Sequence, residues 1–121
     1  MERKAELKQL FKELENQAGI YQIKNIKNQK VLILSTPNFK TINGKQFQLE
    51  MGGFMNKDLQ KEWNEYGKDA FVFEVLEVLE KKEDGRYAGG YSDLKTALEK
   101  LEEKWLDKLQ PFGELGYNKR K

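Results

Sequence analysis

The run FVFEVLEVLE, residues 71–80, constrains the fold of this chain more than any other stretch. It is rich in Val and Phe, which favour β-strands. Side chains along a strand alternate between two faces, and Phe71, Phe73 and Val75 share one of them. The other face is also largely apolar. A strand that is apolar on both faces is typical of the interior of a sheet, so we expect this strand to be central.

Two further strands precede this run. The segment IYQI, Ile20–Ile23, alternates weakly, and VLIL, Val31–Leu34, is a continuous apolar run typical of a buried strand. The connecting residues NIKNQK include Asn25 and Asn28, and both asparagines tolerate a left-handed backbone. The pattern therefore predicts a β-hairpin.

Residues 2–16 place apolar side chains at helical spacing among charged ones, at Leu7, Leu10, Phe11 and Leu14. This spacing predicts an amphipathic helix whose apolar stripe packs on the core; alternatively, the stripe contacts a partner. We accordingly divide the chain into an N-terminal helix, residues 1–17, and a main domain, residues 18–121.

Two of the other helices have clear boundaries. We expect Asn56 to cap a helix that runs to about Tyr66 and is ended by Gly67. We expect Ser92 or Asp93 to cap a last helix that reaches about Leu109. Between residues 37 and 53 the prediction is weakest: Asn38 is a plausible cap, but Gly44 interrupts the helix early. The resulting order is α-β-β-α-α-β-α, which indicates an α+β domain.

Composition limits the chemistry that this chain can use. Its 121 residues suit one domain, and 22 basic against 20 acidic residues leave a net charge of +2, which indicates no particular partner. It has no cysteine and no histidine, so catalysis would have to use carboxylates, Tyr, Lys or Arg. No apolar run is long enough for a membrane span, and we expect a cytoplasmic protein.

One carboxylate lies on the apolar face of the predicted last helix. Glu102 falls inside a stripe formed by Leu94, Leu98, Leu101, Trp105 and Leu109. Burying an unpaired carboxylate costs several kcal/mol, so Glu102 must be paired, bind a metal or line a cleft. Alternatively, it reaches water from the edge of the stripe or pairs with a lysine.

Several motifs together resemble the GIY-YIG nuclease superfamily over about residues 18–118. In order they are Gly19-Ile20-Tyr21, the pattern QIKN…K…S ending at Ser35, the block NKDLQKEWNEYGKDAFVFEVLE, the segment EEKWLDKLQP with Glu102, and Gly116-Tyr117-Asn118. The resemblance implies a small antiparallel three-stranded sheet flanked by helices. It also implies cleavage of phosphodiester bonds with one divalent cation, Mg²⁺ or Mn²⁺.

The resemblance assigns roles to three residues. Tyr21 would orient or deprotonate the attacking water, Glu102 would hold the metal ion, and Asn118 would support the site by hydrogen bonding. Tyr21 and Glu102 also allow a purely structural interpretation, in which the Tyr21 ring packs on the last helix and its hydroxyl bonds Glu102.

The chain departs from the family pattern at the phosphate-binding positions. The second tyrosine of the family aligns with Leu32, the glycine of that triplet with Leu34, and an arginine that clamps phosphate with Ile42. Losing one preorganised charge typically costs about 10²–10³-fold in rate. Lys40 and Lys45 are candidate substitute cations, although a lysine lacks the fork of an arginine.

These observations favour a nuclease-like domain that is catalytically impaired and binds nucleic acid, with DNA as the expected partner. Two alternatives stay open: an active Mg²⁺-dependent endonuclease with a substitute cation, and a structural or protein-binding module. Phosphates would be contacted by lysines of the hairpin and basic residues of the C-terminus, namely Lys24, Lys27, Lys30, Lys119, Arg120 and Lys121.

Overall fold

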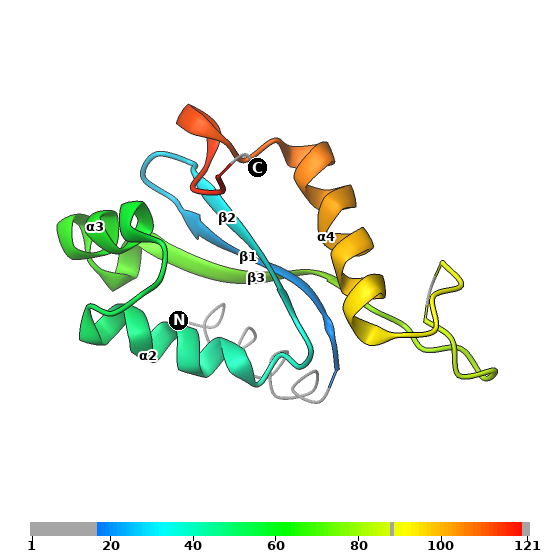
Figure 1. The fold of residues 1–121 in the computed structure, drawn as a ribbon. Coiled ribbons are helices and arrows are strands. Elements are labelled where there is room, and N and C mark those ends of the chain that lie inside the picture. The colour runs from blue at the N-terminus through cyan, green and yellow to red at the C-terminus, as the bar shows by residue number, and fades with distance from the viewer. Residues whose placement is uncertain (1–16, 88, 120–121) are drawn as a thin grey trace.

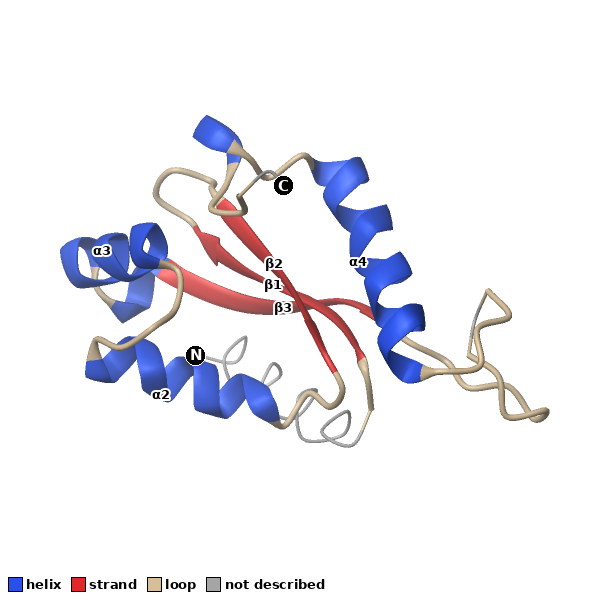
Figure 2. Cartoon of the chain, in the orientation of Figure 1, coloured by secondary structure: helices blue, strands red, loops and turns tan. Residues whose placement is uncertain are grey.

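The computed structural model describes residues 17–87 and 89–119. The helix predicted for residues 2–16 lies outside these ranges, so this helix and the division at residue 17 stay predictions. The described elements are β1 Gly19–Asn25, β2 Val31–Thr36, α2 Thr41–Met51, α3 Lys57–Tyr66, β3 Phe71–Val78 and α4 Leu94–Leu109, with short 3₁₀ turns at Lys68–Ala70 and Gly113–Leu115. Their order confirms the predicted α+β class (Figure 2).

The three strands form one antiparallel sheet in the order β2-β1-β3. The prediction that residues 71–80 form the central strand is therefore wrong, because β1 is central and β3 lies at an edge. Helices cover both faces of the sheet, so an edge strand needs apolar residues on both faces as much as a central one does. In this register Tyr21 of β1 lies between Leu34 of β2 and Val75 of β3.

The sheet separates two groups of helices (Figure 1). Helices α2 and α3 cover the face that carries Tyr21, and side chains from both helices and all three strands form the main cluster there. Helix α4 covers the other face, where Ala97 and Leu98 pack with Leu79 in a smaller cluster. The indole N–H of Trp105 on α4 donates to Glu77 of β3 at 2.9 Å, which fixes the helix over that face.

The predicted hairpin between β1 and β2 is confirmed, but its asparagines act differently from the prediction. The left-handed residue is Gln29, with φ of 66°. The side-chain oxygens of Asn25 and Asn28 instead accept from the backbone N–H groups of Lys27 and Lys30, at 2.9 and 3.0 Å. Such local side-chain bonds shape a turn without a left-handed asparagine.

Helix α2 differs most from its prediction. It runs through Gly44 without a break, and Lys40, not Asn38, occupies its N-cap without a capping side chain. The Asn38 carbonyl accepts instead from the backbone N–H and the hydroxyl of Thr41. Burial of Ile42 and Leu49 on one face stabilises the helix, and this packing outweighs the about 1 kcal/mol that a helical glycine costs.

The other helix boundaries follow the sequence. The Asn56 side chain accepts from the Leu59 N–H at the start of α3, which ends at Gly67. The Asp93 side chain accepts from the Thr96 N–H at the start of α4. Within the described ranges, no helix has the length and apolar character needed to cross a membrane.

Candidate functional site

Tyr21 lies inside the main apolar cluster. It is 1% exposed, and the same cluster includes Phe39 and Ile42 from the α2 side. Its hydroxyl makes no hydrogen bond to another described residue. Burial raises the pKa of Tyr21 well above its usual range, because the apolar surroundings disfavour the phenolate. Its hydroxyl therefore stays protonated at neutral pH and is poorly suited to act as a base.

The positions predicted to align with the second tyrosine and the arginine lie in the same cluster. Leu32 is 4% exposed and Ile42 is 2% exposed, and Leu34 packs against the cluster. A polar or charged side chain at either buried position would need a partner or a route to water. Leu32 and Ile42 are therefore part of the core of the domain.

Glu102 lies half-buried on α4. It makes no hydrogen bond or ion pair with any residue of the described ranges. The structural interpretation of Tyr21 and Glu102 as a hydrogen-bonded pair is wrong, because Tyr21 packs in the cluster under α2 and α3 whereas α4 packs on the other face. Neighbouring residues of a strand point to opposite faces of the sheet, so a residue next to Tyr21 on β1 would face α4, but Tyr21 itself does not.

The residues around Glu102 allow only a sparse metal site. Within residues 17–87 and 89–119, no group of three or more His, Cys, Asp or Glu side chains is placed to hold a metal ion. Mg²⁺ is often held by one or two carboxylates, with waters and substrate phosphates as the other ligands. Glu102, half-buried and unpaired among the described side chains, fits the role of a single protein ligand of that kind.

Asn118 binds the outer edge of β2. Its side-chain oxygen accepts from the Ile33 N–H at 2.8 Å, and its amide group donates to the Ile33 carbonyl at 3.1 Å. Tyr117 adds a bond from its N–H to the Val31 carbonyl at 2.9 Å. Both polar ends of the Asn118 side chain are therefore used to hold the C-terminal segment against the sheet.

The two candidate substitute cations lie on the α2 side of the molecule. Lys40 is exposed at the N-cap of α2, and Lys45 is half-buried one turn after Ile42. Neither lysine forms an ion pair with a carboxylate in the described part of the chain.

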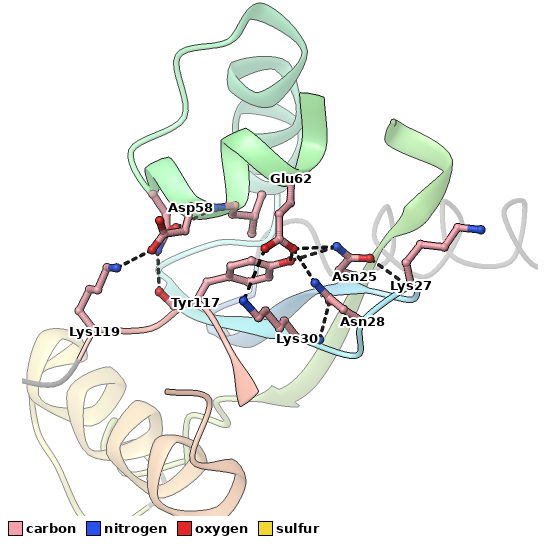
Figure 3. Close-up of polar contacts among 10 residues, drawn as sticks. Asn25, Lys27, Asn28, Lys30, Asp58, Glu62, Tyr117 and Lys119 are labelled. Carbon is pink, nitrogen blue, oxygen red and sulfur yellow. Dashed lines mark hydrogen bonds and ion pairs between the residues drawn. The ribbon is translucent and has the colours of Figure 1, made fainter. Parts of the chain in front are cut away.

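A polar network at the hairpin end of the sheet is centred on Glu62 of α3 (Figure 3). Glu62 Oε1 accepts from the Tyr117 hydroxyl at 2.6 Å, from the Asn28 amide at 2.7 Å and from the Asn25 amide at 3.0 Å. Lys30 adds an ion pair to Glu62 Oε2 at 3.5 Å. The network thus joins the hairpin, α3 and the C-terminal segment through one carboxylate.

The network shifts the titration of its members. Burial alone would raise the pKa of Glu62, but the hydrogen bonds from Tyr117 and Asn28 outweigh it and hold that pKa below its usual range. Burial, with the hydrogen bond to Glu62, raises the pKa of the Tyr117 hydroxyl well above its usual range. The carboxylate is therefore ionised and the phenol neutral over the physiological range, which is the pairing that this hydrogen bond requires.

No motif in the sequence predicts this network. Asn25 and Glu62 are 37 positions apart, and Glu62 and Tyr117 are 55 apart, so no local spacing links them. The network also changes the status of the predicted phosphate-binding lysines, because Lys30 pairs with Glu62 and Lys119 pairs with Asp58. Of the predicted basic set, the other two C-terminal members, residues 120 and 121, lie outside the described residues.

Comparisons with known proteins place this architecture. No protein-family model and no curated protein matches the chain. Two solved structures do match: the catalytic domain of the homing endonuclease I-TevI, and a mutant of the catalytic domain of the intron endonuclease I-TevI. The first has a TM-score of 0.66 and 28% identity and covers 86% of this chain and 99% of its own. The second has a TM-score of 0.65 and 28% identity, with 84% and 92% covered.

I-TevI is a GIY-YIG homing endonuclease. This chain has a GIY-YIG-like fold. The prediction of a small antiparallel three-stranded sheet flanked by helices is confirmed with it. Within the GIY-YIG-like fold, the catalytic roles of Tyr21, Glu102 and Asn118 stay predictions.

Proposed function

We propose that this chain is a nuclease-like domain that binds DNA and has lost most of its capacity to cleave it. The observation that carries this proposal is the burial of Tyr21, Leu32 and Ile42 together in one apolar cluster. The position of the second tyrosine and that of the phosphate-clamping arginine are filled by aliphatic core residues. The remaining tyrosine is enclosed among them.

Catalysis of phosphodiester cleavage depends mainly on charges placed where negative charge develops. The aliphatic residues at positions 32 and 42 supply none, and each missing preorganised group costs about 10²–10³-fold in rate. Such losses are not additive, yet two of them leave little useful activity.

Glu102 and Asn118 can still carry out part of the binding role. Glu102 would hold one Mg²⁺ or Mn²⁺, which when bound supplies a positive charge for a substrate phosphate. Asn118 holds the edge of β2 and would keep that part of the sheet in place as DNA binds. DNA as the partner is supported by the likeness to the catalytic domain of a homing endonuclease.

The test combines cleavage and binding with the same protein preparation. We expect the wild type to nick supercoiled plasmid no more than Glu102→Ala does, with either Mg²⁺ or Mn²⁺. We also expect a gel shift of duplex DNA at about 50 mM salt that weakens as salt increases. Nicking that disappears in Glu102→Ala contradicts the loss of activity, and no shift at low salt contradicts DNA binding and favours a structural or protein-binding module.

The main alternative is an active Mg²⁺-dependent endonuclease with Lys45 as substitute cation. The position of Lys45 favours it over Lys40, because Lys45 lies half-buried on α2 one turn after Ile42. In that case Lys45→Ala would abolish nicking as Glu102→Ala does, while Lys40→Ala would leave it unchanged.

A further inference from the structure

An open hollow lies between the C-terminal end of α2 and one face of α3. It measures about 570 Å³ and is lined by the turn Gly52–Phe54 and by Lys57, Gln60, Lys61 and Asn64 of α3. We call it the α2–α3 hollow. None of its lining residues is acidic, and the two lysines lie one helical turn apart.

The side chains at the floor of the hollow form hydrogen bonds with one another and with the backbone. Gln60 is buried; its side-chain oxygen accepts from the Phe54 N–H at 3.0 Å. Its amide group donates to the Leu49 carbonyl at 2.9 Å and to the Asn64 side-chain oxygen at 3.1 Å. The NH₂ group of Asn64 makes no hydrogen bond to another described residue, so it can donate to a ligand, as the lysines can through their ammonium groups.

The acidic residues of α3 lie to one side of the hollow-lining residues. At about 100° per residue, Asp58, Glu62 and Glu65 lie about 80–140° away from Lys57 and about 40–100° away from Lys61. Asp58 and Glu62 are also paired, with Lys119 and with the hairpin network respectively. The charges of Lys57 and Lys61 are therefore not neutralised by an ion pair with a carboxylate of the described residues.

A surface that offers two cations and an amide donor, with no acidic lining, suits an anion with several oxygens. We propose that the α2–α3 hollow binds the phosphate backbone of DNA, through Lys57, Lys61 and the NH₂ group of Asn64. This inference rests on the proposed function and deepens it, since it moves the main DNA contact away from Lys30 and Lys119. Those two lysines are already committed to Glu62 and Asp58.

The rim of the hollow fits the same ligand. Met51 and Met55 flank the lining turn in sequence and are 70% and 62% exposed. Exposed apolar side chains beside a basic groove provide contact area for the sugars of the backbone. They add contact without sequence readout, so the hollow is expected to bind DNA with little sequence preference.

The experiment measures affinity against salt concentration for a labelled duplex of about 20 base pairs, by fluorescence anisotropy between about 50 and 200 mM salt. The test variant is Lys57→Gln with Lys61→Gln, which removes two charges from the hollow. The control is Lys68→Gln with Lys82→Gln, which removes two exposed charges elsewhere. Lys57→Arg with Lys61→Arg keeps the charges in place.

We expect the test variant to bind about tenfold or more weakly at about 100 mM salt. Its slope of log affinity against log salt should be less steep by about two. The control and the arginine variant should keep the wild-type slope. If the wild type binds DNA and the test variant has the same salt slope, this inference alone is overturned. No binding by the wild type overturns both this inference and the proposed function. Thermal melts of each variant verify that the fold is intact.

Discussion

The ring of Tyr21 is enclosed on β1 by side chains from α2 and α3, and its hydroxyl bonds no described residue. We expect Tyr21→Phe to change the free energy of unfolding by less than about 1 kcal/mol, because it removes no described interaction. Tyr21→Ala should lower it by about 3–5 kcal/mol through the cavity it leaves. Urea unfolding followed by fluorescence measures both. A loss above about 2 kcal/mol in Tyr21→Phe would show that the hydroxyl has a partner.

Other motif residues also have packing roles that their identity alone does not reveal. A Cβ at Gly19 would lie 2.2 Å from the Glu77 carbonyl oxygen, and one at Gly116 would lie 2.4 Å from the Pro111 carbonyl oxygen. Asn118 binds the Ile33 backbone at both ends of its amide. The motifs predicted the fold correctly, because these close approaches define it. They could not predict that Tyr21 is buried, because its burial depends on how residues of α2 and α3 pack over β1.

At the scale of elements, α2 is the helix whose sequence least favours it. Gly44 lies in its interior, and a Cβ built there meets no atom within 4 Å. We therefore expect Gly44→Ala to raise the free energy of unfolding by about 0.5–1 kcal/mol, through helix propensity and a less flexible unfolded chain. Gly52→Ala is the matched control and should destabilise, because Gly52 has φ of +83°. Destabilisation by Gly44→Ala would mean that α2 needs a flexible point there.

Element boundaries were predictable where a local signal sets them, and the sheet order was not. The caps Asn56 and Asp93 and the stop at Gly67 act within one turn of their own helices, so the sequence contains the whole signal. Which strand is central depends instead on how β1 and β3 pair across 46 to 59 positions. The apolar pattern of residues 71–80 reflects the helices that cover both faces of the sheet. A strand at the edge of such a sheet has the same pattern as a central strand.

At the scale of the whole molecule, Glu62 joins three segments that are distant in the sequence. Its carboxylate holds the hairpin and the C-terminal segment on α3 (Figure 3). That segment in turn places Asn118 on β2. A sequence analysis that works outward from motifs treats Glu62 as an exposed helix residue. Only the assembled fold brings its partners together, which is why this part of the site could not be predicted.

The ionisable groups of this network determine how stability depends on pH. The pKa of Glu62 is lower in the folded chain, so its contribution is complete above its ordinary pKa of about 4.3 and is lost as the pH falls through the lowered value. The pKa values of Tyr21 and Tyr117 are raised, so the unfolded chain releases these protons first. Their contribution is complete below about pH 10 and is lost as the pH rises above it.

The chain has no histidine, so no side chain of ordinary pKa titrates between these two limits. We therefore expect the free energy of unfolding to be nearly constant from about pH 5.5 to about pH 9, to fall below about pH 4.5, and to fall again above about pH 10. Urea unfolding at a series of pH values measures this profile. Glu62→Gln should be less stable on the plateau and lose less on acidification, because the residue no longer titrates, whereas Glu65→Gln, on the same helix, should follow the wild type. A step in wild-type stability near neutral pH, or an acid limb unchanged in Glu62→Gln, would contradict the role assigned to this carboxylate.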